Sequence, residues 1–376
     1  MKRILELDYI RGIAMLGVVG IHTGSYLLLN KTASIHLIFA LEVLTRFSIP
    51  AFFFVSAFGS FIKKGILEKV SYKHFLKSRF KSILVPYLIW SFIYMCNYVF
   101  MTGDSSIFYW PLFGEFLLFG VASYQLYFLV ILCWFYILMP VWIKLAKVML
   151  KNGVVFLSVL FVFQILFHYV LGNVRFDPGD NYYLNVFWKY KLNYVVFYYI
   201  FIFFLGAYFA LKFNEVKKFL SKRSILIDCV FILTTISITA YYYYLLDIKA
   251  YDPISVVNMC QQLSFPGFLF STAAIVFLYK TFILTDLNKS IRKCLNLFAK
   301  HSYIIYLVHP LFMYYISFAL IAKDIRMTVP VTILFFIVVT FLSIMTSVMI
   351  TRTSKVLPEI GLLLMGKGRV KRDKSV

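Results

Sequence analysis

The chain is poor in charge and in cysteine, and it lacks the motifs of the common soluble enzymes. Charged residues make up only 14% of its 376 residues, well below the fraction in an average soluble domain. The five cysteines are scattered without a C-x-x-C pair, so neither a disulfide framework nor a thiolate metal site is indicated. No GxSxG, HExxH, Walker or GxGxxG motif occurs, and no cluster of histidines and carboxylates has metal-ligand spacing. The sequence therefore argues against a metal enzyme and against an ATP-driven pump.

Long hydrophobic runs fill the chain instead. Hydrophobic residues account for 62% of the sequence, and ten runs are long enough to cross the roughly 30 Å hydrocarbon core of a bilayer. The first run is too long, and too interrupted by Asp8 and Arg11, for a cleaved signal peptide, so it is expected to remain as a span. We therefore predict an all-α, polytopic integral membrane protein with about ten transmembrane helices. They cover residues 8–29, 36–62, 83–101, 125–143, 154–172, 194–212, 225–246, 262–284, 303–322 and 329–351.

The distribution of the cations predicts the orientation of these spans. The net charge is +22, and 29 of the 38 lysines and arginines fall in segments on the same side as the N-terminus. Because cytoplasmic loops carry an excess of Lys and Arg, both termini are predicted to be cytoplasmic, with the protein in the plasma membrane. The inner cations are expected to meet anionic lipid head groups of the bilayer, and no nucleic-acid partner is expected. No linker-like segment exceeds about 25 residues, so we predict one transmembrane domain, residues 1–352, and a short basic cytoplasmic tail, residues 353–376.

Arg11 and His22 lie within the first run and are the strongest candidates for a chemical role. Eleven helical steps separate them, which places both side chains on one helix face, about 16 Å apart along the axis. An imidazole takes a proton from an attacking hydroxyl and returns it to a leaving thiolate, as acyl transfer from a thioester requires. The alternative is structural, in which His22 only hydrogen-bonds a neighbouring helix. Asp8 precedes Arg11 by three residues and is predicted to pair with it, while the charge of Arg11 holds a phosphate or a carboxylate.

Three further polar residues fall inside predicted spans. Glu42 and Arg46 are four residues apart in the second span and are able to pair. Counting from the outer ends of the two spans gives Glu42 about the same depth as His22, so we expect Glu42 to orient the imidazole. His309 precedes Pro310, which bends the helix. A polar ring beside such a kink is expected to line a cavity, although the kink alone also makes packing room.

Cations also gather in the inner loop before the third span. Lys73, Lys77, Arg79 and Lys81 follow one another at spacings of two to four residues. They form a cationic rim suited to a phosphate-bearing cofactor that arrives from the cytosol. The alternative is that these residues only determine the topology of the chain.

Three stretches of the sequence resemble the signature of the membrane acyltransferase 3 family. They are Leu7-Asp8-Tyr9-Ile10-Arg11-Gly12-Ile13-Ala14 with His22, Arg46-Phe47-Ser48-Ile49-Pro50-Ala51-Phe52-Phe53-Phe54-Val55-Ser56, and Ser302-Tyr303-Ile304-Ile305-Tyr306-Leu307-Val308-His309-Pro310. The resemblance covers nearly the whole chain, and the motifs occur in the family's order. The chain departs from the pattern at two places. Ala57 stands where the family usually has glycine, and Arg79-Phe80-Lys81 replaces two arginines three residues apart.

The resemblance implies an O-acyltransferase that moves an acyl group, usually acetyl, from acyl-CoA to a hydroxyl of a surface or exported glycan or of a lipid-linked saccharide. It places Arg11 and His22 at the family's arginine and catalytic histidine positions, with His22 as general base and no metal. The residues expected to line or orient the site are Asp8, Glu42, Arg46, Ser302, Tyr306 and His309, and those expected to bind the CoA donor are Lys77, Arg79 and Lys81.

Two other functions stay open at this point. One is a polysaccharide exporter or flippase, in which Arg11, Glu42 and Arg46 line a conduit and no acyl-CoA is needed. The other is a non-catalytic membrane subunit of a polysaccharide synthesis system. The sequence does not fix the acceptor glycan, the acyl chain, the side of the membrane at which the acceptor is modified, or the oligomeric state. It also leaves open whether a separate partner protein completes the transfer.

Overall fold

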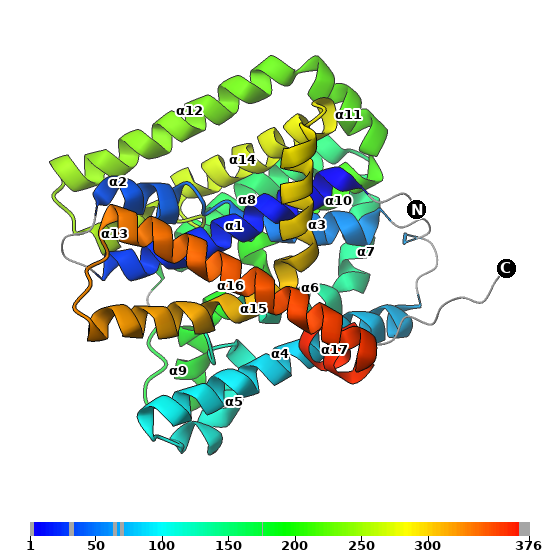
Figure 1. Cartoon of the computed structure of the whole chain (residues 1–376). Coiled ribbons are helices and arrows are strands. Elements are labelled where there is room, and N and C mark those ends of the chain that lie inside the picture. The colour runs from blue at the N-terminus through cyan, green and yellow to red at the C-terminus, as the bar shows by residue number, and fades with distance from the viewer. Residues whose placement is uncertain (1–3, 30–33, 63–65, 68–70, 175, 368–376) are drawn as a thin grey trace. The chain divides into compact units, whose positions relative to one another are not determined.

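The computed structural model describes residues 4–29, 34–62, 66–67, 71–174 and 176–367. Within those ranges it contains helices and no strand (Figure 1), which confirms the predicted all-α class. The chain divides into two compact units, each described by itself. Unit 1 comprises Met1–Lys64, Asn152–His168 and Tyr199–Ile344, and unit 2 comprises Gly65–Lys151, Tyr169–Tyr198 and Met345–Val376.

Unit 1 is built around α1 (Leu5–Leu28), which packs against α15 (Lys289–Ala322), α3 (Ser48–Phe61) and α14 (Phe265–Leu284). In turn, α3 packs against α10 (Ile200–Leu211). Figure 1 shows that α15 changes direction along its length, and this helix contains the predicted bending residue Pro310. The other helices that lie wholly in unit 1 are α2 (Ile35–Ile38), the π-helical η1 (Phe39–Val43), α11 (Phe213–Lys222), α12 (Ser224–Tyr243), η5 (Tyr244–Ile248) and α13 (Pro253–Cys260).

Two glycines allow the helices of unit 1 to approach closely. A Cβ atom at Gly12 of α1 would lie 2.6 Å from the backbone oxygen of Leu295 in α15. A Cβ atom at Gly206 of α10 would overlap the carbonyl of Phe54 in α3. Only a residue without a side chain fits at such contacts, which are typical of helix packing in membranes.

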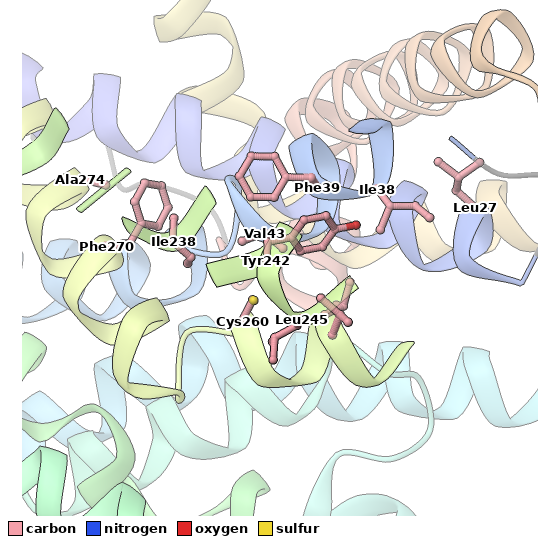
Figure 2. Packing of buried hydrophobic residues seen from close by; sticks show 12 residues of the cluster. Leu27, Ile38, Phe39, Val43, Ile238, Tyr242, Leu245, Cys260, Phe270 and Ala274 are labelled. Atoms are coloured by element: carbon pink, nitrogen blue, oxygen red, sulfur yellow. The ribbon is translucent and has the colours of Figure 1, made fainter. Parts of the chain in front are cut away.

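A buried hydrophobic cluster connects the C-terminal part of α1 with η1, α12, α13 and α14 (Figure 2). The rings of Phe39 and Tyr242 lie with their centroids 4.9 Å apart. The Tyr242 hydroxyl donates a hydrogen bond to the carbonyl oxygen of Ile35 at 3.0 Å. This packing holds η1, which carries Glu42, beside α1. The buried members of the cluster are Leu27, Ile38, Phe39, Val43, Ile238, Tyr242, Leu245, Val256, Val257, Cys260, Phe270 and Ala274.

Unit 2 centres on α4 (Tyr72–Thr102), which packs against α5 (Leu112–Phe119), α6 (Tyr127–Ile137) and α17 (Pro358–Met365). Trp90 Nε1 donates to the carbonyl oxygen of Leu364 at 3.3 Å. Part of the predicted tail is therefore helical and packed, while its residues 368–376 lie outside the described ranges. The remaining helices are η2 (Ser106–Phe108), α7 (Met139–Met149), α9 (Tyr182–Lys189) and η3 (Lys191–Asn193). Three described helices have residues in both units, α8 (Gly153–Asn173), η4 (Val196–Tyr199) and α16 (Val329–Val356).

Seven helices among the described residues are long and apolar enough to cross a membrane. Two bent helix pairs raise the number of candidate spans to nine if each pair is taken as one span. The bent pairs are α6 with α7, at 68°, and Val196–Leu211 with α11, at 100°. These nine correspond to the second through tenth predicted spans. The first predicted span forms α1 but is not among them. The count of ten spans and the cytoplasmic position of the termini stay predictions.

Candidate functional site

The first part of the site is the α1 helix, which carries Asp8, Arg11 and His22 without interruption. Arg11 Nη1 donates to Asp8 Oδ1 at 3.1 Å, so the predicted ion pair forms. The side chain of Arg11 is 37% exposed, whereas that of Asp8 is 8% exposed. The Asp8 carboxylate therefore positions the Arg11 guanidinium, which remains accessible to a ligand.

His22 of α1 and His309 of α15 form a stacked pair of imidazole rings. The ring centroids lie 5.3 Å apart and the ring planes are inclined by 23°. His309 is fully buried, whereas His22 is partly exposed. The packing of α1 against α15 thus brings together two residues that lie near opposite ends of the chain.

The hydrogen bonding of His309 fixes its tautomer. Its Nδ1 atom lies 2.9 Å from the carbonyl oxygen of Ile305 in the preceding turn. A carbonyl oxygen only accepts, so Nδ1 carries the proton and Nε2 presents a lone pair. Nε2 is buried and has no hydrogen-bond partner among the residues that the structure describes. An unpaired buried acceptor costs about 1–3 kcal/mol, so this atom is suited to receive a donor from a ligand.

A buried ion pair lies beside the imidazoles. Glu42 is 0% exposed, and its carboxylate pairs with the guanidinium of Arg46, whose side chain is 17% exposed. The other carboxylate oxygen of Glu42 accepts from Ser25 Oγ at 2.6 Å. The predicted pairing of Glu42 with Arg46 is therefore present, and Arg46 and His309 both act electrostatically on His22. The expectation that Glu42 orients the His22 ring stays a prediction.

Two more predicted site residues precede His309 on α15. Tyr306 is buried, and its ring centroid lies 6.4 Å from that of His309. Ser302 is also buried, but its hydroxyl donates to the carbonyl oxygen of Ala299 in its own helix at 3.0 Å. Tyr306 therefore lies next to the imidazole pair, and Ser302 is occupied with its own backbone.

The cations predicted to bind the donor belong to unit 2. Arg79 lies over the rings of Phe75 and Tyr136, with its guanidinium carbon 5.4 and 5.1 Å from their centroids. Lys77 and Lys81 are exposed on the first turns of α4. Among the described residues no group of three or more histidines, cysteines or carboxylates could hold a metal ion.

Comparison with known proteins identifies the family. A family model described as an acyltransferase domain matches residues 4–352. The chain belongs to the acyltransferase 3 family. It is therefore an acyltransferase, and with its many apolar helices it is a multi-pass membrane protein. It is also similar to proteins named "Probable poly-beta-1,6-N-acetyl-D-glucosamine export protein" in Staphylococcus aureus strains MRSA252 and MSSA476, at 24% identity over 318 residues, or 83% of each chain. No solved structure matches the chain significantly.

Three residues of this acyltransferase near the imidazoles were not predicted from the sequence. Ser25 bonds Glu42, as described above. Tyr26 follows His22 by four residues and hydrogen-bonds the Ser317 side chain of α15. The four-residue spacing between His22 and Tyr26 could have indicated that both side chains lie on the same face of α1, because residues four apart share a helix face. Nothing in the local sequence pointed to Ser317, which follows His309 by two helical turns.

Proposed function

We propose that this acyltransferase moves an acetyl group from acetyl-CoA to a hydroxyl of a cell-envelope glycan. The observation that supports this most is the stacked pair of His22 and His309, with a partly exposed imidazole next to a buried one. No activated serine or cysteine was evident in the sequence, so direct attack by the acceptor hydroxyl is the simpler route. The acceptor class is suggested by the relatives, whose name refers to a polymer of β-1,6-linked N-acetylglucosamine.

In this mechanism His22 acts as the general base. The acceptor oxygen attacks the thioester carbonyl carbon while its proton passes to His22. The new C–O bond forms, the C–S bond breaks, and the imidazolium returns the proton to the leaving thiolate to give free CoA. The ion pair of Glu42 with Arg46 lies beside this imidazole and fixes the local charge.

The donor is held by cations in this proposal. Arg11, kept in place by Asp8, binds a phosphate or a polar group of the pantetheine arm through its exposed guanidinium. The sequence predicts that Lys77, Arg79 and Lys81 bind the CoA phosphates, and this contribution stays a prediction. With the termini in the cytoplasm, as the positive-inside rule predicts, the donor arrives from the cytosol and the protein lies in the plasma membrane.

The second candidate function is export of the glycan. It is favoured by the name of the relatives, which describes a probable export protein. Intramembrane charges such as Arg11, Glu42 and Arg46 would then line a conduit. An exporter requires no thioester, so the consumption of acetyl-CoA separates the two functions.

The test uses the full chain in lipid nanodiscs with radiolabelled acetyl-CoA and a β-1,6-linked N-acetylglucosamine pentasaccharide, hereafter the acceptor oligosaccharide. We expect thiol release coupled to labelling of the oligosaccharide. His22→Ala is expected to lower kcat by about 10²–10⁴-fold, the usual contribution of a general base. The matched control is His36→Ala, because His36 is exposed and its Nδ1 contacts the Tyr243 hydroxyl at 2.7 Å.

Two results would overturn the proposal. Absence of thiol release from the folded wild-type protein, together with passage of the oligosaccharide across proteoliposomes, would establish export instead. Equal thiol release by the wild type and by His22→Ala would remove His22 from the mechanism.

A further inference from the structure

The contacts between α1 and α15 follow one another in the same order along both helices. Gly12 meets Leu295, His22 stacks on His309, and Tyr26 hydrogen-bonds Ser317. The two helices therefore run in the same direction. Arg11 lies toward the N-terminal end of this interface, and Tyr26 lies toward its C-terminal end, on the other side of the imidazole pair.

Tyr26 and Ser317 place an aromatic ring next to two hydroxyl groups, and these are chemical groups that can bind a sugar. The Ser317 hydroxyl donates to the carbonyl oxygen of Tyr314 at 2.9 Å, so its oxygen is left to accept from Tyr26. Tyr26, Tyr314 and Ser317 are all partly exposed. An aromatic ring with a hydroxyl at its tip offers an apolar face and a polar edge, which match the C–H face and the hydroxyls of a pyranose. His22 and Tyr26 are one helical turn apart, about 6 Å along the axis, a separation that one sugar residue can bridge.

The unpaired Nε2 atom of His309 supplies the second observation. It is a fully buried acceptor with a fixed lone pair, and no described residue donates to it. A sugar carries several neighbouring hydroxyls, so one can attack beside His22 while an adjacent one donates to Nε2. A donor from the ligand would remove the cost of the unpaired acceptor.

From these observations we infer that His309, Tyr26 and Ser317 form the subsite that holds the acceptor sugar. This inference deepens the proposed function and rests on it. His309 positions the sugar by accepting from a hydroxyl next to the reacting one, and Tyr26 with Ser317 holds the sugar ring one turn further along α1. The acceptor sugar then binds toward the C-terminal end of the interface between α1 and α15. The acyl-CoA donor binds toward the N-terminal end of this interface, where Arg11 lies.

A pair of substitutions at His309 tests the positioning role. Glutamine places its amide oxygen near the position of Nε2, whereas asparagine places its amide near Nδ1 and leaves the Nε2 position empty. His309→Asn is therefore expected to raise the acceptor KM and the dissociation constant of the acceptor oligosaccharide about tenfold, the equivalent of 1.4 kcal/mol. His309→Gln is expected to restore most of the affinity. The acetyl-CoA KM stays unchanged in both variants.

Tyr26→Phe removes one hydroxyl and is expected to weaken binding of the acceptor oligosaccharide about three- to tenfold, the range for one hydrogen bond. The matched control is Tyr315→Phe, because Tyr315 is 44% exposed and lies at the next position after Tyr314 on α15. This control is expected to bind the oligosaccharide like the wild type. Binding is measured by calorimetry in nanodiscs without acetyl-CoA, so it does not depend on turnover.

The outcomes distinguish this inference from the proposed function. Equal affinities of His309→Asn, His309→Gln and the wild type would overturn the inference even if acetyl transfer is observed. Selective loss of affinity in His309→Asn and Tyr26→Phe, in a protein that releases no thiol, would support the subsite and refute acetyl transfer. A parallel loss of acetyl-CoA affinity in both variants would indicate general distortion of the helix interface and would also overturn the inference.

Discussion

Removing the charge of Glu42 is predicted to be one of the most destabilising single substitutions in the chain. Its carboxylate is 0% exposed and pairs with Arg46, whose side chain is 17% exposed. Glu42→Gln keeps an amide oxygen that accepts from Ser25 but leaves the guanidinium without its counter-charge. Breaking one side of a buried ion pair costs roughly 3–5 kcal/mol. Because Arg46 retains some exposure and the Ser25 hydrogen bond survives, we expect a loss at the lower end, about 3 kcal/mol.

The free energy of unfolding is to be measured in mixed micelles by titration with a denaturing detergent. The matched control is Glu215→Gln, which breaks an ion pair of similar sequence spacing between Lys212 and Glu215. The side chains of that pair are 32% and 65% exposed, and exposed pairs contribute little to stability. The reasoning is wrong if both substitutions change the free energy of unfolding equally. The same variant tests the expected role of Glu42 in orienting His22, because full acetyl transfer by stable Glu42→Gln protein would remove that role.

Two further predictions concern helix packing and capping. Gly12→Ala is expected to cost roughly 1–3 kcal/mol in unfolding assays, because the new methyl overlaps the backbone oxygen of Leu295. Gly59→Ala, with nothing within 4 Å of the new atom, should be neutral or stabilising, and equal losses would refute the packing argument. Hydrogen bonds from the side chain and backbone of Ser255 lower the pKa of Asp252 from 3.8. The cap of α13 is then intact above pH 3.8 and is lost as the pH falls through the lowered pKa. Hydrogen exchange should show α13 amides losing protection in acid, and at neutral pH in Asp252→Ala.

Most of the helical framework could be predicted because hydrophobic length is a local property of the sequence. The sharp bends within two of the candidate spans, α6 with α7 and Val196–Leu211 with α11, were not predicted from the sequence. The break between α6 and α7 has a local cause, since Pro140 enters at the start of α7 and has no amide hydrogen. The bend of 100° before α11 has no proline or glycine at the break. It coincides with a change from the wholly apolar α10 to a helix in which only Val216 and Leu220 are buried.

The site was predictable where its contacts are local. Asp8 with Arg11 and Glu42 with Arg46 are three and four residues apart, so helical geometry alone brings them together. The stacking of His22 on His309 is different, because it depends on the packing of α1 against α15. Counting residues from the outer ends of the first two predicted spans gives Glu42 and His22 similar depths in the membrane. The count does not predict that Ser25 donates a hydrogen bond to the Glu42 carboxylate. A tertiary contact of this kind requires the packing of two helices, which a single sequence does not specify.

Buried charge alone does not distinguish an enzyme from a conduit, but the arrangement of the charges does favour chemistry. Glu42 and Arg46 neutralise each other, so the uncharged polar groups beside them are the two imidazoles, and Nε2 of His309 presents a lone pair without a donor among the described residues. A path for a neutral polysaccharide needs hydrogen-bonding groups along its length and no group that gains and loses a proton. Transfer from a thioester needs a proton acceptor at one point, with a fixed acceptor nearby to orient the attacking molecule. His22 and His309 match the second requirement, and for this reason the arrangement fits acyl transfer better than export.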